Sequence, residues 1–423
     1  MSLKRSLFSS TLMRVVSAAL TFLYGVVLAR LLGPDAYGHY VQIFSWISLG
    51  YFLSTAGLPV LVLRETALSN AAGEDGLSKG VLLFAIGVFL ALLAICGLAY
   101  TLSETLFGFV SPVTEIKSLA LITVLLWGLS ILFENATRGM GHTTLGQLAE
   151  LILRPGLGIV TVLGLLWTTS HGTLTETDAI WALLGATLAT CGFSAVTYGH
   201  VMRQRWSAQA RVSWRAWIHG TALNSTTSIL IKSSFALSFL LIGYFVGPSE
   251  LGIYRVNYQL TVSAGLGLLA AKAIVAPQIA RAGTTGETPS ASEIYRASIR
   301  LCLMFSLPIV TVLLTIPDLV VATVYGEAFI GSRHTLQILA FSVLINSVFG
   351  PIDVLLQVRR RDFTLLFAAL LRVAVLFGLI LILTPIYGIA GSALAYTASI
   401  TCWCVVMLFG HHRSKLNTEL YDT

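Results

Sequence analysis

GPDAYGHY, residues 33–40, follows one long apolar run and precedes another. Gly33 and Pro34 begin a turn, because glycine admits positive φ and proline fixes φ and lacks a backbone donor. The chain repeats this turn at residues 247–254, GPSELGIY, and the two segments share the frame G-P-x-x-x-G-x-Y. The second copy lies 214 positions after the first in a chain of 423 residues. We therefore expect the chain to consist of two related halves.

The composition indicates an integral membrane protein. The chain is 56% hydrophobic and 11% charged, whereas a soluble domain has about 25% charged residues. So few charges cannot cover a surface that faces water. The sequence thus predicts an all-α integral membrane fold.

Long uncharged segments give the number of membrane spans, since a helix needs about 20 apolar residues to cross the hydrocarbon core. Residues 80–103 contain no charged side chain and predict one span. Residues 373–412 also contain none, but as one helix they would run about 60 Å. Pro385 and Gly388 therefore mark a hairpin of two spans. Applied along the chain, this predicts twelve transmembrane helices, at residues 10–32, 38–62, 80–103, 116–136, 145–168, 178–202, 221–246, 252–277, 297–317, 334–357, 363–384 and 388–410.

The distribution of Lys and Arg predicts the orientation, because cytoplasmic loops carry an excess of both. Seventeen lie on one side of the predicted spans and four on the other. The four are Arg30, Lys117, Arg255 and Arg333. Both termini are then cytoplasmic, and both copies of the repeated turn are external. There we expect Tyr40 and Tyr254 to act as anchors at the membrane interface.

A second sequence echo supports two halves. LILRPGL at residues 151–157 resembles ALLRVAV at 369–375, with nearly the same offset as the repeated turn. Six spans per half is an even number, so both halves enter the membrane from the same side. The pseudo-two-fold axis between the two six-helix bundles then runs along the membrane normal, around a central cavity. We divide the chain into an N-terminal bundle, a basic cytoplasmic linker, a C-terminal bundle and a cytoplasmic tail, at residues 1–202, 203–220, 221–410 and 411–423. The linker is basic and aromatic, and we expect it to form a helix at the cytoplasmic surface.

Charges inside the predicted spans are the candidate functional residues, because a charge at mid-bilayer costs about 2.5–3.5 kcal/mol on insertion scales and often marks a site. The basic ones are Arg14, Arg154, Lys232, Lys272 and Arg372, and the acidic ones are Glu134, Glu150 and Asp353. This excess of positive charge predicts a cavity that holds an anion. Its predicted substrate-binding residues are Lys232, Arg372, Arg154 and Arg14.

Some of these charges have a structural alternative. Glu150 and Arg154 are four residues apart and can pair along one helix. Arg14 and Lys272 can extend to the membrane interface.

The remaining charges have two interpretations each. The acidic residues Glu134, Glu150 and Asp353 are candidates for ion coupling or for ion pairs with the basic residues. Arg64 and Arg138 anchor the cytoplasmic side or line the inner mouth of the cavity.

Motifs of soluble chemistry do not occur in the sequence. There is no Walker loop, no H-E-x-x-H and no G-x-S-x-G, so neither ATP hydrolysis nor these hydrolytic mechanisms are expected. The eight histidines have no ligand spacing and the five cysteines lie in apolar runs. We therefore expect no enzyme activity, no metal, no cofactor and no nucleic-acid partner.

Several segments resemble one known family. ARLLGPDAYGHY at 29–40 and STAGLPVLVLRETA at 54–67 are similar to the start of bacterial polysaccharide flippases of the O-antigen type. Residues 325–363 and 384–399 resemble the second half of the same family. These proteins belong to the multidrug/oligosaccharidyl-lipid/polysaccharide exporter superfamily, and the resemblance implies two six-helix bundles around a central cavity.

The resemblance implies a flippase in the bacterial inner membrane. Its substrate would be an undecaprenyl-pyrophosphate-linked oligosaccharide, which it would move from the cytoplasmic to the periplasmic leaflet by alternating access. The implied partners are this lipid-linked oligosaccharide, membrane lipid, and the polymerase and chain-length proteins of polysaccharide assembly. No family motif assigns a binding residue, so the cationic cavity rests on the charge argument.

Two other functions stay open. A multidrug or cation antiporter of the same superfamily would favour an acidic or neutral cavity. A non-transporting scaffold of a polysaccharide assembly complex would need no charge inside the membrane.

Overall fold

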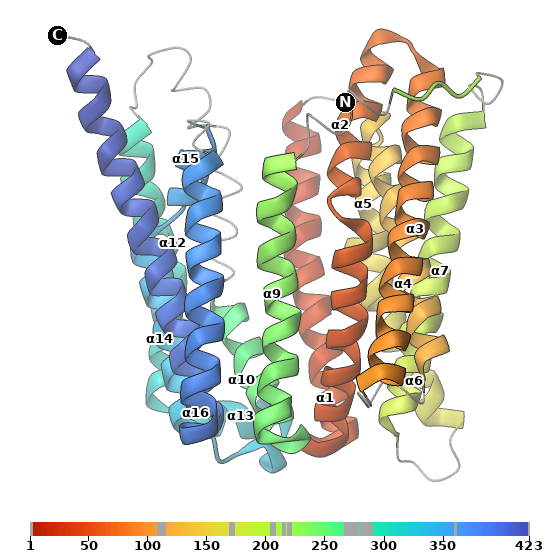
Figure 1. Cartoon of the computed structure of the whole chain (residues 1–423). Helices are drawn as coiled ribbons and strands as arrows, with labels where there is room; N and C mark the ends of the chain where they lie inside the picture. The colour runs from red at the N-terminus through yellow and green to blue at the C-terminus, as the bar shows by residue number, and fades with distance from the viewer. Residues whose placement is uncertain are drawn as a thin grey trace. The chain divides into compact units, whose positions relative to one another are not determined.

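All secondary structure in the described part of the computed structural model is helical (Figure 1). The structure describes residues 3–107, 116–168, 174–203, 209–213, 217, 222–265, 278, 291–358 and 362–421. The helices are α1 (Leu3–Thr55), α2 (Leu58–Ala72), α3 (Asp75–Phe107), α4 (Lys117–Gly139), α5 (Thr143–Leu148), the π-helix η1 (Ala149–Leu153), α6 (Arg154–Thr168), α7 (Glu176–Met202), α9 (Ala222–Val246), α10 (Pro248–Ala264), α12 (Ala291–Thr315), α13 (Pro317–Tyr325), the 3-10 helix η3 (Glu327–Phe329), α14 (Arg333–Phe349), α15 (Ile352–Val358) and α16 (Asp362–Tyr421).

Eight helical stretches among the described residues are long and apolar enough to cross a membrane. They are Leu12–Thr55, Asp75–Leu106, Lys117–Gly139, Thr143–Trp167, Glu176–Met202, Thr226–Val246, Glu293–Thr315 and Phe363–Gly410. The prediction of an all-helical, multi-pass membrane protein is thus confirmed.

The longest of these stretches, in α1 and α16, are each folded into a hairpin. In α1 the hydroxyl oxygens of Tyr24 and Tyr40 are 3.4 Å apart, although 16 residues of straight helix would separate them by about 24 Å. In α16 the backbone turns at Gly388, which has φ 58°. A Cβ atom added at Gly391 would lie 2.1 Å from the carbonyl oxygen of Leu383, so the two arms meet directly after the turn. The predicted break in residues 373–412 is confirmed, and Figure 1 shows the two blue arms of α16 side by side.

The repeated turn has the same backbone conformation in both copies. Gly33 has φ 72° and ψ 174°, and Gly247 has φ 83° and ψ 174°. Only glycine adopts this region without strain, which costs other residues about 1–3 kcal/mol. The sequence frame therefore encodes the same elbow twice. The first copy starts the second arm of α1, and the second copy starts α10.

The two elbows also pack against each other. A Cβ atom on Gly38 would lie 1.8 Å from the carbonyl oxygen of Pro248, and one on Gly252 would lie 2.2 Å from that of Pro34. Each elbow thus places its second glycine against the proline of the other copy. Such a reciprocal contact is typical of packing about a two-fold axis.

The tyrosines that end the elbows are not interface anchors, contrary to expectation. Tyr40 is 5% exposed and Tyr254 is 3% exposed. The ring of Tyr40 stacks on Phe44, with centroids 5.9 Å apart. Both rings are therefore buried inside the protein, and the Tyr40 hydroxyl lies 3.4 Å from that of Tyr24.

Glycines also interrupt two spans that the sequence predicts as continuous. The span predicted at 38–62 ends with α1 at Thr55, and Gly57, with φ 79°, precedes α2. The span predicted at 334–357 breaks at Gly350, with φ 56°, between α14 and α15. In both places a glycine with positive φ changes the direction of the chain. The apolar pattern of the sequence does not predict these breaks, because it continues through them.

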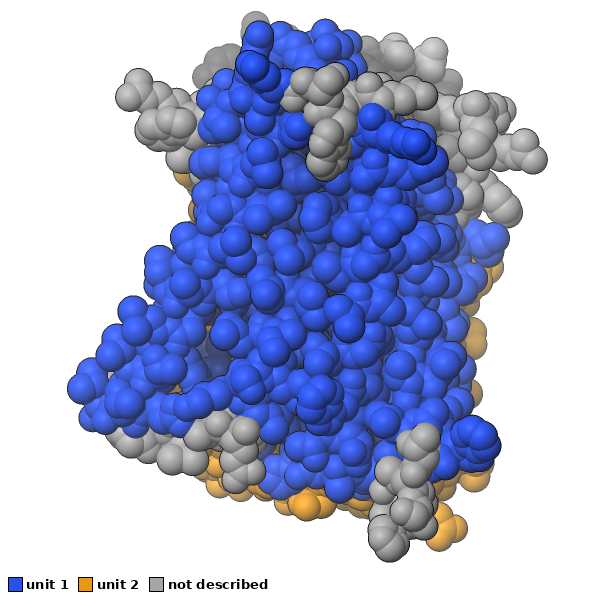
Figure 2. Space-filling view, turned by 90° about the vertical axis from the view of Figure 1, so that its right-hand side faces the viewer, with its two compact units in different colours: residues 1–32, 39–240 blue, residues 33–38, 241–423 orange. Residues whose placement is uncertain are grey.

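The chain forms two compact units (Figure 2). Unit 1 consists of residues 1–32 and 39–240, and unit 2 of residues 33–38 and 241–423. In unit 1, α4 packs against α7, α2 and α3. In unit 2, α14 packs against α16, α12 and α10.

The predicted linker, residues 203–220, lies mostly outside the described residues. Its described residues 209–213 are not helical, so the expected surface helix does not include them. The backbone N–H of Arg211 donates to the carbonyl of Gly76 over 2.9 Å. The ring of Trp217 lies 5.4 Å from that of Phe84, between centroids. This part of the linker is therefore fixed to α3 within unit 1.

Candidate functional site

A cavity of about 220 Å³ lies inside unit 1. It is formed by the end of α1, the start of α2, the C-terminal half of α4, η1 and the middle of α9. Its polar lining includes Thr55, Asn135, Arg138, Glu150, Ser228 and Lys232. Three of these six are charged, two of them positively. The sequence marked these three charges individually, and the structure brings them to one space.

Lys232 extends into this cavity from α9. Its side chain is exposed, and its ammonium lies 5.9 Å from the centroid of the Phe52 ring, which also lines the cavity. Such a contact is a weak cation–π interaction and does not neutralise the charge. Among the described residues, no carboxylate lies within 4 Å of this ammonium. Lys232 therefore offers a free cation to a ligand.

Arg138 supplies the second cation, from the last turn of α4. One guanidinium nitrogen donates to Asn135 Oδ1 over 3.1 Å. Its Nε is buried and has no hydrogen-bond partner among the described residues. Gly146 makes room for the side chain, since a Cβ atom there would lie 2.5 Å from Arg138 Cγ. The neighbours thus hold the guanidinium in one orientation.

Glu150 lines the same cavity from the π-helix η1. It forms no ion pair with Arg154 within 4 Å, so the pairing that the four-residue spacing allows does not occur in the described structure. The wider turn of a π-helix explains this, because four residues no longer return to the same face. The sequence pattern contains no sign of this turn.

Arg154 instead lies behind the cavity. Its guanidinium carbon is 4.7 Å from the centroid of the Trp127 ring. Trp127 in turn stacks on Tyr51, a residue of the cavity wall, with centroids 4.5 Å apart. Nε and Nη2 of Arg154 are buried without a hydrogen-bond partner in the described part of the chain. The structure thus shows Arg154 next to the cavity and not among its lining residues.

Glu134 is buried between α4 and α7. It is 2% exposed and accepts hydrogen bonds from Ser130 Oγ at 2.8 Å and Ser194 Oγ at 3.3 Å. These two hydroxyl groups are hydrogen-bond donors to the carboxyl group. No cation lies within 4 Å of it among the described residues. Its role in ion coupling stays a prediction.

The other predicted charges lie elsewhere. Arg14 is exposed on the first arm of α1, close enough for its charge to act on Arg138. Arg64 pairs with its neighbour Glu65 at 2.6 Å and does not line the cavity. Lys272 lies outside the described residues.

Two predicted residues belong to unit 2. The guanidinium carbon of Arg372 lies 5.8 Å from the centroid of the Trp403 ring in α16. Asp353 is half-buried in the first turn of α15. Their role at a substrate site stays a prediction.

Asn135, Thr55 and Ser228 line the cavity, although the charge pattern of the sequence does not indicate them. A signal exists for Asn135 alone, since it precedes Arg138 by three residues and shares its helix face. Thr55 and Ser228 are uncharged and look like ordinary polar residues of a membrane helix.

Solved structures with the same fold are membrane transporters. The chain is similar to an inward-facing multidrug resistance MATE family transporter of the MOP superfamily, with TM-score 0.73 and 17% identity over 96% of this chain and 99% of that one. It is also similar to the lipid II flippase MurJ in an inward closed conformation, with TM-score 0.70 and 14% identity over 95% of this chain and 87% of that one. A MOP superfamily transporter from Pyrococcus furiosus matches with TM-score 0.67 and 15% identity over 97% of this chain and 95% of that one.

Sequence comparison identifies the family. No curated protein matches the chain. The sequence pattern of the family described as "Polysaccharide biosynthesis protein" matches residues 27–334, which is more than half of the chain. The resemblance noted in the sequence is confirmed: the chain belongs to this family of polysaccharide biosynthesis proteins, on the fold of the MOP superfamily transporters.

Proposed function

We propose that the chain is a flippase for an undecaprenyl-pyrophosphate-linked oligosaccharide, which it moves from the cytoplasmic to the periplasmic leaflet of the bacterial inner membrane. The family supports a role in polysaccharide assembly, and the fold supports a membrane transporter. The observation that carries the proposal is the cavity of unit 1, in which Lys232 and Arg138 face one space with a single carboxylate, Glu150.

The chemistry of these two cations suits a pyrophosphate. Lys232 is a point charge with three donors, and Arg138 has a planar guanidinium that binds phosphate oxygens through two parallel hydrogen bonds. Asn135 already orients the guanidinium. In a cavity surrounded by apolar helices, each charge-assisted hydrogen bond to phosphate contributes about 1.5–3 kcal/mol.

The proposed movement is alternating access of two six-helix bundles. The eight long apolar helices, two of which are hairpins, would give twelve spans together with α10 and α14. The identical conformation and reciprocal packing of the two elbows support a repeated architecture. In this proposal both termini are cytoplasmic. Arg154 adds positive charge next to the charged cavity, and Arg372 stays a predicted substrate-binding residue of unit 2.

The second candidate is a multidrug or cation antiporter. A specific observation favours it: the fold neighbour with TM-score 0.73 is named as a multidrug resistance transporter. Glu150 in the cavity would attract a cationic drug, but Lys232 and Arg138 would repel it. A scaffold that assembles with the polymerase and chain-length proteins is the third candidate, and it would tolerate the loss of all these charges.

Complementation of a bacterial strain that lacks its own polysaccharide flippase tests the proposal. We expect Lys232→Ala and Arg372→Ala each to abolish surface polysaccharide, while immunoblots show normal amounts of inserted protein. Lys232→Arg should keep part of the activity because it keeps the charge. The matched control is Arg30→Ala, which removes an exposed arginine of the same unit that lines neither the charged cavity nor the second cavity of this unit.

The outcomes separate the three candidates. Normal polysaccharide in both Lys232→Ala and Arg372→Ala would contradict the cationic site and favour the scaffold. Resistance to cationic drugs that depends on Glu150, without restoration of polysaccharide, would favour the antiporter.

A further inference from the structure

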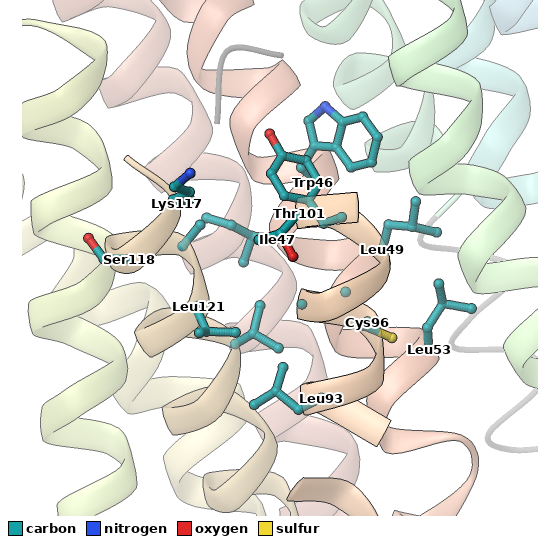
Figure 3. Close-up of a pocket in the computed structure, with 15 residues that line it drawn as sticks. Trp46, Ile47, Leu49, Leu53, Leu93, Cys96, Thr101, Lys117, Ser118 and Leu121 are labelled. Carbon is teal, nitrogen blue, oxygen red and sulfur yellow. The ribbon is translucent and has the colours of Figure 1, made fainter. Parts of the chain in front are cut away.

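A second cavity of unit 1, of about 290 Å³, lies between the second arm of α1, α3 and α4 (Figure 3). Its apolar wall includes Leu49, Leu53, Leu93, Cys96 and Leu121. In Figure 3, Lys117 and Ser118 lie on the opposite side of the cavity from Leu53 and Cys96. Apolar cavities in proteins stay dry and accept apolar ligands. This one is part of three membrane helices, where the surrounding solvent is hydrocarbon.

Two glycines create this cavity. A Cβ atom at Gly97 of α3 would meet only Leu121 Cδ1, at 4.0 Å, and one at Gly50 of α1 would meet only Val124 Cγ2, at 3.6 Å. Both distances are ordinary van der Waals contacts. The helices therefore leave room beside these glycines for a chain of methylene groups.

One end of the cavity carries groups suited to a lipid head group. Trp46 and Tyr100 meet edge to face, with centroids 5.9 Å apart, and such amphipathic rings are enriched at the head-group level of membranes. Next to them, the Lys117 ammonium forms an ion pair with Glu104 at 3.1 Å. Lys117 is 52% exposed and Glu104 is 19% exposed. The cavity thus passes from an apolar body to a polar rim with one charge of each sign.

We propose that this cavity binds one acyl chain of a zwitterionic aminophospholipid. The lipid phosphate would accept hydrogen bonds from Lys117, whose ammonium uses one of its three donors for Glu104. The lipid ammonium would donate to Glu104, whose Oε1 forms no hydrogen bond with another described residue. Among the described residues of the rim, the charges of Lys117 and Glu104 cancel, and this pair therefore complements a head group with both charges better than a purely anionic one.

This site differs from the charged cavity in its ligand and in its position. The apolar cavity uses the N-terminal part of α4, residues 117–124, whereas the charged cavity uses residues 131–138 of the same helix. The Lys and Arg distribution predicts that Lys117 is on the external side. The bound lipid would thus come from the outer leaflet, and the inference does not depend on what the charged cavity transports.

The proposal is tested by native mass spectrometry. The full chain is mixed with defined lipids in detergent and then released from the detergent in the spectrometer. The probes are phosphatidylethanolamine and phosphatidylglycerol with the same acyl chains. We expect one molecule of phosphatidylethanolamine to bind at least tenfold more tightly than phosphatidylglycerol. Gly97→Leu places a side chain in the cavity and should lower this affinity at least tenfold.

The matched control is Gly87→Leu on the same helix, since Gly87 is exposed and a Cβ atom there meets nothing within 4 Å. It should bind phosphatidylethanolamine like the unmodified chain. Glu104→Gln should remove the preference for phosphatidylethanolamine over phosphatidylglycerol and leave binding of both.

Three outcomes would overturn the proposal. One is equal lipid affinity of Gly97→Leu and Gly87→Leu, which would place the lipid elsewhere. Another is tighter binding of phosphatidylglycerol than of phosphatidylethanolamine. The third is displacement of phosphatidylethanolamine by an equal concentration of a polyprenyl phosphate, which would make the cavity a site for the carrier lipid.

Discussion

The two cavities of unit 1 share two helices and have opposite character. The second arm of α1 and helix α4 line both of them. Where α4 begins, its side chains surround an apolar space with one neutralised ion pair at the rim. Where α4 ends, the same helix gives Asn135 and Arg138 to a space that contains two cations and one carboxylate.

The difference shows how one helix can serve two kinds of ligand. Along α4, Trp127 lies between the residues of the two cavities and stacks on Tyr51 at 4.5 Å. Phe44 also stacks on the same indole, with centroids 6.0 Å apart. This aromatic cluster separates a region that suits hydrocarbon from one that suits an anion. Of the three charged residues of α4, Glu134 and Arg138 follow Trp127 in the sequence, and only Lys117 precedes it.

Removal of both cations of the charged cavity should have the largest effect. Lys232→Ala combined with Arg138→Ala removes two charge-assisted contacts of about 1.5–3 kcal/mol each. We expect transport to fall by about 100- to 10,000-fold, since each 1.4 kcal/mol is a factor of ten. The measurement is the rate of surface polysaccharide formation in complemented cells. Equal rates for this variant and for the control Arg30→Ala would mean that the charged cavity has no role in transport.

Loss of the aromatic wall should destabilise the whole unit. Trp127→Ala removes a large ring that contacts Tyr51, Phe44 and Arg154, and substitutions of this type cost about 3–5 kcal/mol. The midpoint of thermal unfolding in detergent should fall clearly. Trp127→Phe keeps a ring and should recover part of the loss. An unchanged midpoint in Trp127→Ala would mean that the ring does not support either cavity.

Overpacking next to this wall should cost less. In α4, a Cβ atom at Gly128 would lie 2.1 Å from Phe89 Cζ, and the Phe89 ring is fully buried. Gly128→Ala should therefore lower the free energy of unfolding by about 1–3 kcal/mol. Gly87→Ala on α3 meets nothing and is the control, since it should be neutral or stabilise by up to about 1 kcal/mol. A neutral result at Gly128 would show that α3 and α4 can separate locally.

The smallest effect is expected outside both cavities. Arg64→Ala breaks the ion pair with Glu65, in which the arginine side chain is 39% exposed. Exposed pairs contribute about 0–1 kcal/mol, so stability and transport should change little. A loss of transport comparable to that of Lys232→Ala would place Arg64 on the substrate path and extend the charged region to α2.

The features predicted well from sequence are those with a unique residue requirement. Gly33 and Gly247 marked two equivalent elbows because their conformation admits almost only glycine. Pro385 and Gly388 marked the hairpin of α16 because its uncharged stretch was too long for one span. Lys232 and Glu150 stood out because charge is rare in membrane helices, whereas Arg138 was expected only as a cytoplasmic anchor or a residue of the inner mouth.

What could not be predicted depends on packing. The apolar cavity is invisible in the sequence, since Leu93 or Leu121 would look the same against lipid or against another helix. Arg154 was expected among the cations of the site, but the π-helix η1 turns it toward Trp127. Tyr40 was expected at the interface, but it is buried against Tyr24 and Phe44.

The reciprocal elbow contact also constrains the order of biogenesis. The carbonyl of Pro34 faces Gly252, and the carbonyl of Pro248 faces Gly38. Pro248 is synthesised 214 residues after Pro34, which at about 5–20 residues per second is a delay of roughly 10–40 s. During that interval the first hairpin of the nascent chain exists without the partner that packs on its tip. Membrane insertion must therefore keep this tip available until the second copy of the turn arrives.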